Sequence, residues 1–93
     1  MSQDEKVIAA TPARIPLDLR NVKAYRLARS ESQTVFWQRF LVTQSSGSRY
    51  EQGAKISPTL GMLITGWAAG LITEGQLAVL ANSYRNNVGE REA

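Results

Sequence analysis

The side chains best able to do chemistry in this 93-residue chain lie in residues 43–52, Thr-Gln-Ser-Ser-Gly-Ser-Arg-Tyr-Glu-Gln. Glutamine can pair with adenine through two hydrogen bonds, and arginine can pair with guanine in the same way. A short helix with such side chains and no long apolar ones can enter the major groove of DNA. The same composition also suits a capped surface helix. As base-reading residues we therefore predict Gln44, Ser45, Ser46, Ser48 and Arg49.

The chain has no Cys and no His, which argues against the common zinc sites, disulfides, thiol nucleophiles and histidine bases. Glu51 and Glu74 stand far apart and make no acid–base pair, and we expect Glu51 to bond backbone or Arg groups near the Gly53 turn. The glycines lack the Lys-Ser/Thr ending of a phosphate-binding loop. We therefore expect no enzymatic activity, no cofactor and no metal.

Positive charge is concentrated between Arg14 and Lys55. This stretch has eight basic and three acidic residues, whereas the segments before and after it each sum to −1. One basic face on an otherwise neutral domain suits a polyanion such as nucleic acid, although a net charge of +3 also suits solubility alone.

The elements that must position these side chains are helices of one small domain. Pro12 and Pro16 predict an extended, flexible N-terminal arm at residues 1–16. Apolar periodicity and capping residues predict an all-α domain at 17–85 and a disordered tail at 86–93. Its five helices are expected at 17–28, from Ser30 or Ser32 to Phe40, from Thr43 to Gln52, from the Ser57-Pro58 pair to Gly70, and from the Thr73–Gln76 capping box to residue 85.

Residues 36–53 have helix-turn-helix spacing, with a tight turn at Leu41-Val42. On residues 43–53 the chain resembles the XRE, or lambda-repressor-like, family of DNA-binding domains. Ser32-Gln33 and Ser57-Pro58 match the starts of the family's second and fourth helices, so the resemblance covers about residues 17–70. It implies a five-helix lambda-repressor-like domain that binds double-stranded DNA.

The chain departs from the family pattern in three places. Leu41 stands where relatives often have Gly, so either a left-handed leucine is tolerated at a cost of about 1 kcal/mol or the turn is built differently. Glu31 replaces a residue that relatives usually bury as apolar. Trp37 and Gly47 exchange the usual sizes of two facing residues, so we predict that the Trp37 ring packs over Gly47.

Trp37 and Trp67 could be stacking platforms for single-stranded bases, but their helical spacing favours the core. The expected helix that begins at Thr43 is the recognition helix, which would enter the major groove. Phosphate contacts are expected from Gln33 and Thr43, at helix N-termini, and from Lys55 in the loop after the recognition helix. The last helix has an apolar face that so small a domain does not fully cover. The predicted dimer interface on this face consists of Leu77, Leu80, Ala81 and Tyr84.

These features predict a transcriptional repressor that acts as a homodimer on an inverted-repeat operator. Stand-alone family members of this length look like plasmid, phage or toxin–antitoxin regulators, so an antitoxin that regulates its own locus is one alternative. A helical protein-interaction module that does not bind DNA is another. The chain opens with polar residues and has no apolar run near 18 residues, so we expect no signal peptide, no membrane span and a cytoplasmic location.

Overall fold

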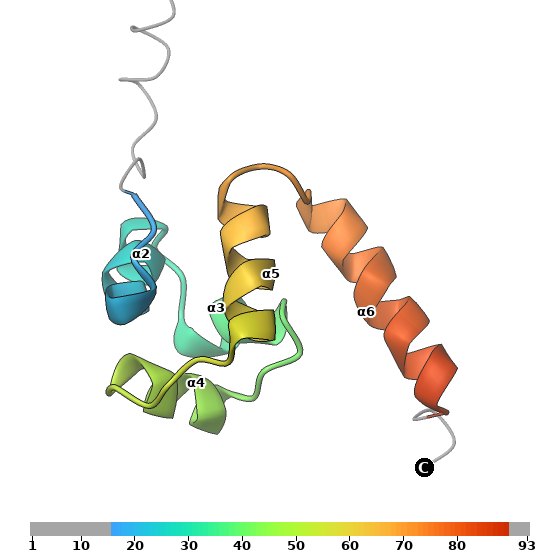
Figure 1. The fold of residues 1–93 in the computed structure, drawn as a ribbon, viewed down its shortest axis with the longest axis horizontal. Helices are drawn as coiled ribbons and strands as arrows, with labels where there is room; N and C mark the ends of the chain where they lie inside the picture. The colour runs from blue at the N-terminus through green and yellow to red at the C-terminus, as the bar shows by residue number, and fades with distance from the viewer. Residues whose placement is uncertain (1–15, 90–93) are drawn as a thin grey trace, which may run out of the picture.

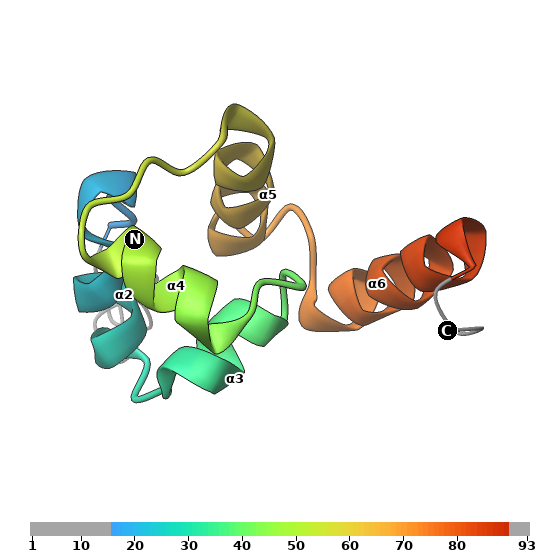
Figure 2. The same cartoon turned by 90° about the horizontal axis from the view of Figure 1, so that it is seen from below.

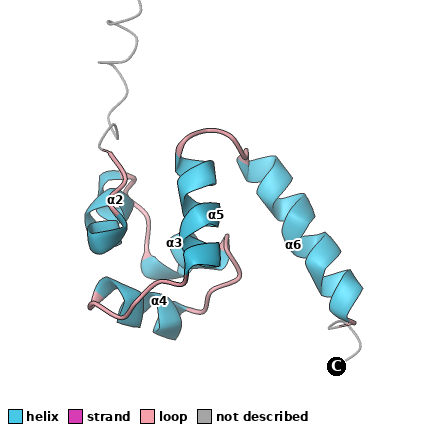
Figure 3. Cartoon of the chain, viewed as in Figure 1, coloured by secondary structure: helices cyan, strands magenta, loops and turns pink. Residues whose placement is uncertain are grey.

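The computed structural model describes residues 16–89, which form five α-helices and one 3-10 turn, with no strand in this range (Figures 1 and 3). This confirms the predicted all-α helix-turn-helix fold. The predicted arm lies outside the described residues except for Pro16. The elements are η1 (Leu19–Asn21), α2 (Val22–Ala28), α3 (Gln33–Gln38), α4 (Gln44–Glu51), α5 (Pro58–Ala68) and α6 (Glu74–Val88).

Hydroxyl caps begin α3, α4, α5 and α6. The side-chain oxygens of Ser32, Thr43 and Ser57 each accept a hydrogen bond from the amide three residues further on, at 3.1, 3.1 and 3.2 Å. Thr73 forms the expected reciprocal capping box. These caps satisfy amides that have no partner within the helix. They confirm the predicted helix starts, with Ser32 and not Ser30 as the cap of α3.

Helices α3 and α5 each end two residues before the predicted position, at Gln38 and Ala68, and the two outer boundaries of the domain differ more. The first helical segment opens with η1, because the Asp18 carboxylate caps the amide of Arg20 at 2.9 Å, and α2 begins only at Val22. At the other end, α6 continues past residue 85 to Val88 and closes at Gly89, whose φ is 71°. Residues 86–88, predicted to belong to a disordered tail, are therefore helical, and residues 90–93 lie outside the described part.

Helices α2 to α5 surround one aromatic core, and α6 points away from them in both views (Figures 1 and 2). Phe36 lies at the centre, with its ring centroid 5.2 Å from that of Trp37 and 5.7 Å from those of Phe40 and Trp67. Trp37 is 0% and Trp67 7% exposed, so neither is a stacking platform for bases. The buried hydrophobic residues are Val22, Tyr25, Phe36, Trp37, Phe40, Ile64, Trp67 and Leu77.

A cluster of charged side chains covers Trp67. The guanidiniums of Arg29 and Arg39 each lie 4.6 Å from the centroid of the Trp67 ring. Glu31 accepts hydrogen bonds from Arg39 at 2.7 Å and from Arg29 at 3.2 Å, and Glu74 accepts one from the Trp67 indole at 3.1 Å. Glu31, which stands where relatives usually bury an apolar residue, is thus an ion-pair partner of Arg29 and Arg39. Glu74 connects the first turn of α6 to Trp67 of α5.

Candidate nucleic-acid interface

The two helices of the helix-turn-helix, α3 and α4, pack through Trp37 and Gly47. A β-carbon at Gly47 would lie 2.7 Å from the indole Nε1 of Trp37 and closer still to its Cδ1 and Cγ. Trp37 is fully buried and has no room to move aside. This confirms the predicted contact and shows why this position of α4 has no side chain.

The turn between the two helices contains a left-handed leucine. Leu41 has a φ of 60°, and its amide donates to the carbonyl of Gln38 at 2.9 Å. The amide of Val42 donates to the carbonyl of Trp37 at 3.1 Å. The chain therefore keeps the usual tight turn and accepts a leucine there, at a cost of about 1 kcal/mol.

Glu51, the last residue of α4, is the centre of a group of buried hydrogen bonds between α2, α3 and α4. Its carboxylate, in a side chain only 3% exposed, accepts hydrogen bonds from Arg26 at 2.8 and 2.9 Å, from Gln33 at 3.0 Å and from the Trp37 indole at 2.9 Å. Burial raises the pKa of Glu51, but these bonds outweigh burial and lower it to about 2. The arginine partner was expected near Gly53, but it comes from α2.

Gln33 joins this centre to the start of α4. Its Nε2 donates to Glu51, and its Oε1 accepts a hydrogen bond from Gln44 Nε2 at 2.6 Å. The Gln33 side chain is predicted to hold a DNA phosphate. In the structure it orients the side chain of Gln44 through this hydrogen bond. Sequence spacing alone did not reveal this link, because the three residues lie 11 and 18 positions apart.

The outward face of α4 is polar. Ser45, Ser48, Arg49 and Gln52 follow one another at helical spacing, so they share this face. Ser45, Arg49 and Gln52 are exposed and Ser48 is half-buried. The prediction missed Gln52, although its separation of four residues from Ser48 places the two side chains together, and Gln52 Nε2 donates to Ser48 Oγ at 3.0 Å.

The other predicted contacts surround this face. Ser46 lies on its flank, half-buried, where its hydroxyl accepts a hydrogen bond from Arg49 at 3.4 Å. Thr43 caps the helix, and its hydroxyl still has a hydrogen to donate. Lys55 is exposed in the loop between α4 and α5. Donors thus stand at both ends of α4.

The structure alters the predicted dimer interface at one residue. Leu77 is 4% exposed and belongs to the core of its own domain, so it is not free to meet a partner. Leu80 and Tyr84 are 51% and 53% exposed, and Ala81 is half-buried. The exposed part of the apolar face therefore begins one turn later than expected.

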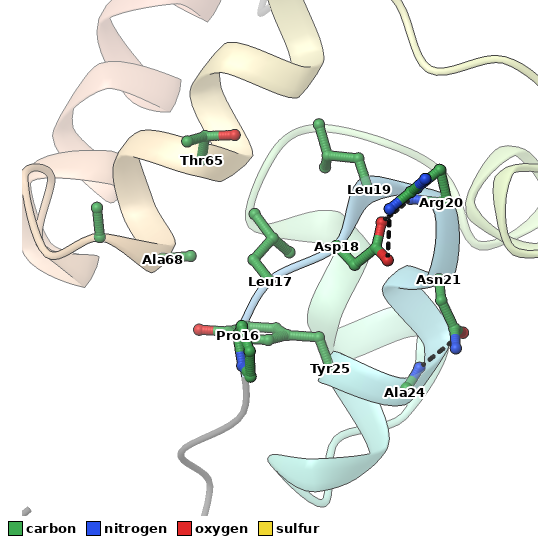
Figure 4. A pocket seen from close by; sticks show the side chains of 11 residues that line it. Pro16, Leu17, Asp18, Leu19, Arg20, Asn21, Ala24, Tyr25, Thr65 and Ala68 are labelled. Carbon is green, nitrogen blue, oxygen red and sulfur yellow. Dashed lines mark hydrogen bonds and ion pairs between the residues drawn. The ribbon is translucent and has the colours of Figure 1, made fainter.

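A groove of about 1210 Å³ lies between α5 and the segment that leads through η1 into α2. Figure 4 shows Leu17 and Tyr25 on one wall and Thr65 and Ala68 on the other. Residues 16–89 contain no cluster of three potential metal-binding side chains and no helix long and apolar enough to cross a membrane. In this groove the Asp18 carboxylate is paired with Arg20 at 3.0 Å.

Two short helices joined by a tight turn, the second with an exposed polar face, define a helix-turn-helix DNA-binding domain. Residues 23–65, from α2 into α5, match the model of a family described as the RsaL-like HTH domain. No curated protein and no solved structure gave a significant match. The match supports a helix-turn-helix family and indicates a DNA-binding regulator.

Proposed function

We propose that this protein is a sequence-specific transcriptional repressor of the XRE-like type, which binds double-stranded DNA as a homodimer and has no enzymatic activity. The observation that carries this proposal is the chain of hydrogen bonds from Glu51 through Gln33 to Gln44. It holds one amide side chain in place at the exposed N-terminal end of α4.

The held amide retains the groups needed for adenine. An amide nitrogen has two hydrogens, and Gln44 donates only one of them to Gln33. The other hydrogen and the carbonyl oxygen can bond N7 and N6 of adenine in the major groove. Because the side chain is already ordered, binding loses less conformational entropy than it would with a free glutamine.

Arg49 supplies a second base-reading group on the same face. Within residues 16–89 its guanidinium makes one hydrogen bond, to Ser46, which is long at 3.4 Å, so most of its donors are available to guanine. Ser45, Ser46 and Ser48 are small enough to let the helix lie deep in the groove. We assign phosphate contacts to Thr43, the cap of α4, and to Lys55, in the loop after α4.

A homodimer is proposed because α6 presents an apolar face that its own domain leaves exposed. A two-fold dimer with one recognition helix per subunit reads an inverted repeat, with half-sites about 10–10.5 base pairs apart, centre to centre. Repression requires only that the bound dimer cover a promoter.

Selection of duplexes from a random pool by the purified chain, followed by footprinting, tests this function. We expect an enriched inverted repeat. On that site Gln44→Ala should lose about tenfold or more in affinity. Asn82→Ala, which removes an exposed amide from α6, is the matched control and should bind as the wild type does. Enrichment of no sequence would reject base recognition, and no binding to DNA at all would favour the protein-interaction alternative.

A further inference from the structure

Leu41 presents an apolar side chain that the fold of a single chain does not require. The tight turn needs a positive φ, which glycine adopts more easily than leucine. The leucine side chain is nevertheless 39% exposed. Leu41 thus has an unfavourable backbone conformation and a partly exposed apolar side chain. This combination points to a contact between Leu41 and another molecule.

A groove of about 600 Å³ runs between this turn and α6. One wall consists of residues 40–43 with Gln38, and the other of Tyr84 and Arg85. In Figure 1 the turn that leads into α4 lies between α5 and α6. Leu41 and Tyr84, 43 positions apart in sequence, therefore line the same groove.

Tyr84 also belongs to the apolar stripe of α6. Leu80, Tyr84 and Val88 follow one another four residues apart and are 51%, 53% and 52% exposed. The groove and the stripe are therefore continuous at Tyr84. We name these four side chains, Leu41, Leu80, Tyr84 and Val88, the turn–stripe surface.

The occupant that fits this surface is α6 of a second copy. Three half-exposed side chains on one helix expose much less than the roughly 800 Å² per partner that a stable interface buries. Leu41 adds apolar area next to them, and the groove around these side chains must supply the rest. The apolar side chains of the second copy's α6 can pack into the groove between residues 40–43 and α6 of the first copy. The only charged residues from Glu74 to Val88 are Glu74 and Arg85, so two α6 helices do not repel one another.

We propose that the turn–stripe surface is the dimer interface, with α6 of each copy seated in the groove between Leu41 and Tyr84 of the other. In a two-fold dimer the contact is reciprocal, so each Leu41 meets the partner's stripe. Because Leu41 lies two residues before the cap of α4, dimerisation then holds the turn that positions the recognition helix. This inference rests on the homodimer of the proposed function and assigns its surface.

Leu41→Gly provides the test, because it removes the side chain and relieves the backbone at once. The variant should keep or gain thermal stability as a monomer, while the dimer dissociation constant from sedimentation equilibrium rises about tenfold. Ser30→Gly is the matched control, since Ser30 is exposed in the turn after α2 with a φ of 59°. It should give the same backbone relief and leave the dissociation constant unchanged.

Three results would overturn the proposal. If Leu80→Asp breaks the dimer but Leu41→Gly leaves the dissociation constant unchanged, α6 dimerises without the turn. If the wild-type chain stays a monomer at micromolar concentration, the homodimer itself fails along with its surface. If Leu41→Gly weakens binding to a single half-site by a monomer, the side chain contacts DNA instead.

Discussion

The indole of Trp37 fills the space that a side chain at Gly47 would need, so one large residue and one missing side chain set the distance between α3 and α4. The same indole donates a hydrogen bond to Glu51 at 2.9 Å. The recognition helix is thus positioned by a steric contact and a polar contact from one residue.

Gly47→Ala should destabilise the protein by about 1–3 kcal/mol, because the added methyl overlaps a ring that has no room to shift. At a solvent-exposed helix position the same substitution would stabilise the protein by up to about 1 kcal/mol. The sign of the change in unfolding free energy therefore tests the contact. Gly75→Ala is the control, since a β-carbon there would meet only Thr73 Oγ1 at 4.0 Å. Urea denaturation measures both, and a gain in stability for Gly47→Ala would contradict the contact.

Acid should weaken the fold partly through Glu51. Its pKa is about 2 in the folded chain against an ordinary 4.5, so its ionised form stabilises the fold fully above about pH 4.5. That contribution, about 3 kcal/mol, is lost as the pH falls from about 4.5 to 2. Hydrogen bonding to Arg39 also lowers the pKa of Glu31, which adds to the loss in acid.

Glu51→Gln should therefore flatten, without abolishing, the fall of unfolding free energy in this pH range, because Glu31 remains. At pH 7 the variant should be less stable by about 3–5 kcal/mol, since Arg26 keeps a buried charge without its partner. Urea denaturation from pH 2 to pH 7 gives both quantities. Parallel curves for the variant and the wild type would show that Glu51 carries no such contribution.

Gln33→Ala tests whether Gln33 orients Gln44 or holds a phosphate. We expect roughly two- to tenfold weaker binding to the selected site, because Gln44 must then be ordered on binding, and little change on a scrambled duplex. Thr34→Ala, at the exposed neighbouring position of α3, is the control. Equal losses on both duplexes would instead assign Gln33 to the phosphate backbone.

Local signals in the sequence were enough to predict most of the fold. Hydroxyl residues before apolar periodicity fixed the starts of α3 to α6, because a cap acts on the amide only three residues away. The Trp37–Gly47 contact could also be predicted, because an unusually large residue at one position and a glycine at the facing position are both visible in the sequence.

Long-range partners could not be predicted in the same way. The hydrogen bonds of Glu51 connect α2, α3 and α4, and residue types alone do not select among the available arginines and glutamines. Leu77 has the same periodicity as Leu80 and Tyr84, yet it is buried, because it packs into the core of the domain at the start of α6. The predicted end of α6 is three residues too early, because residues 86–93 are mostly polar, although Val88 continues the apolar stripe.

The measurement that tests the central claim most directly compares Arg49→Ala with Lys55→Ala on the selected site and on a scrambled duplex across a salt titration. Arg49→Ala should lose about 1–3 kcal/mol on the selected site alone, because it reads a base. Lys55→Ala should weaken binding to both duplexes alike and reduce the salt slope by about one unit, because it holds a phosphate. Equal losses on both duplexes for Arg49→Ala would contradict base reading by α4.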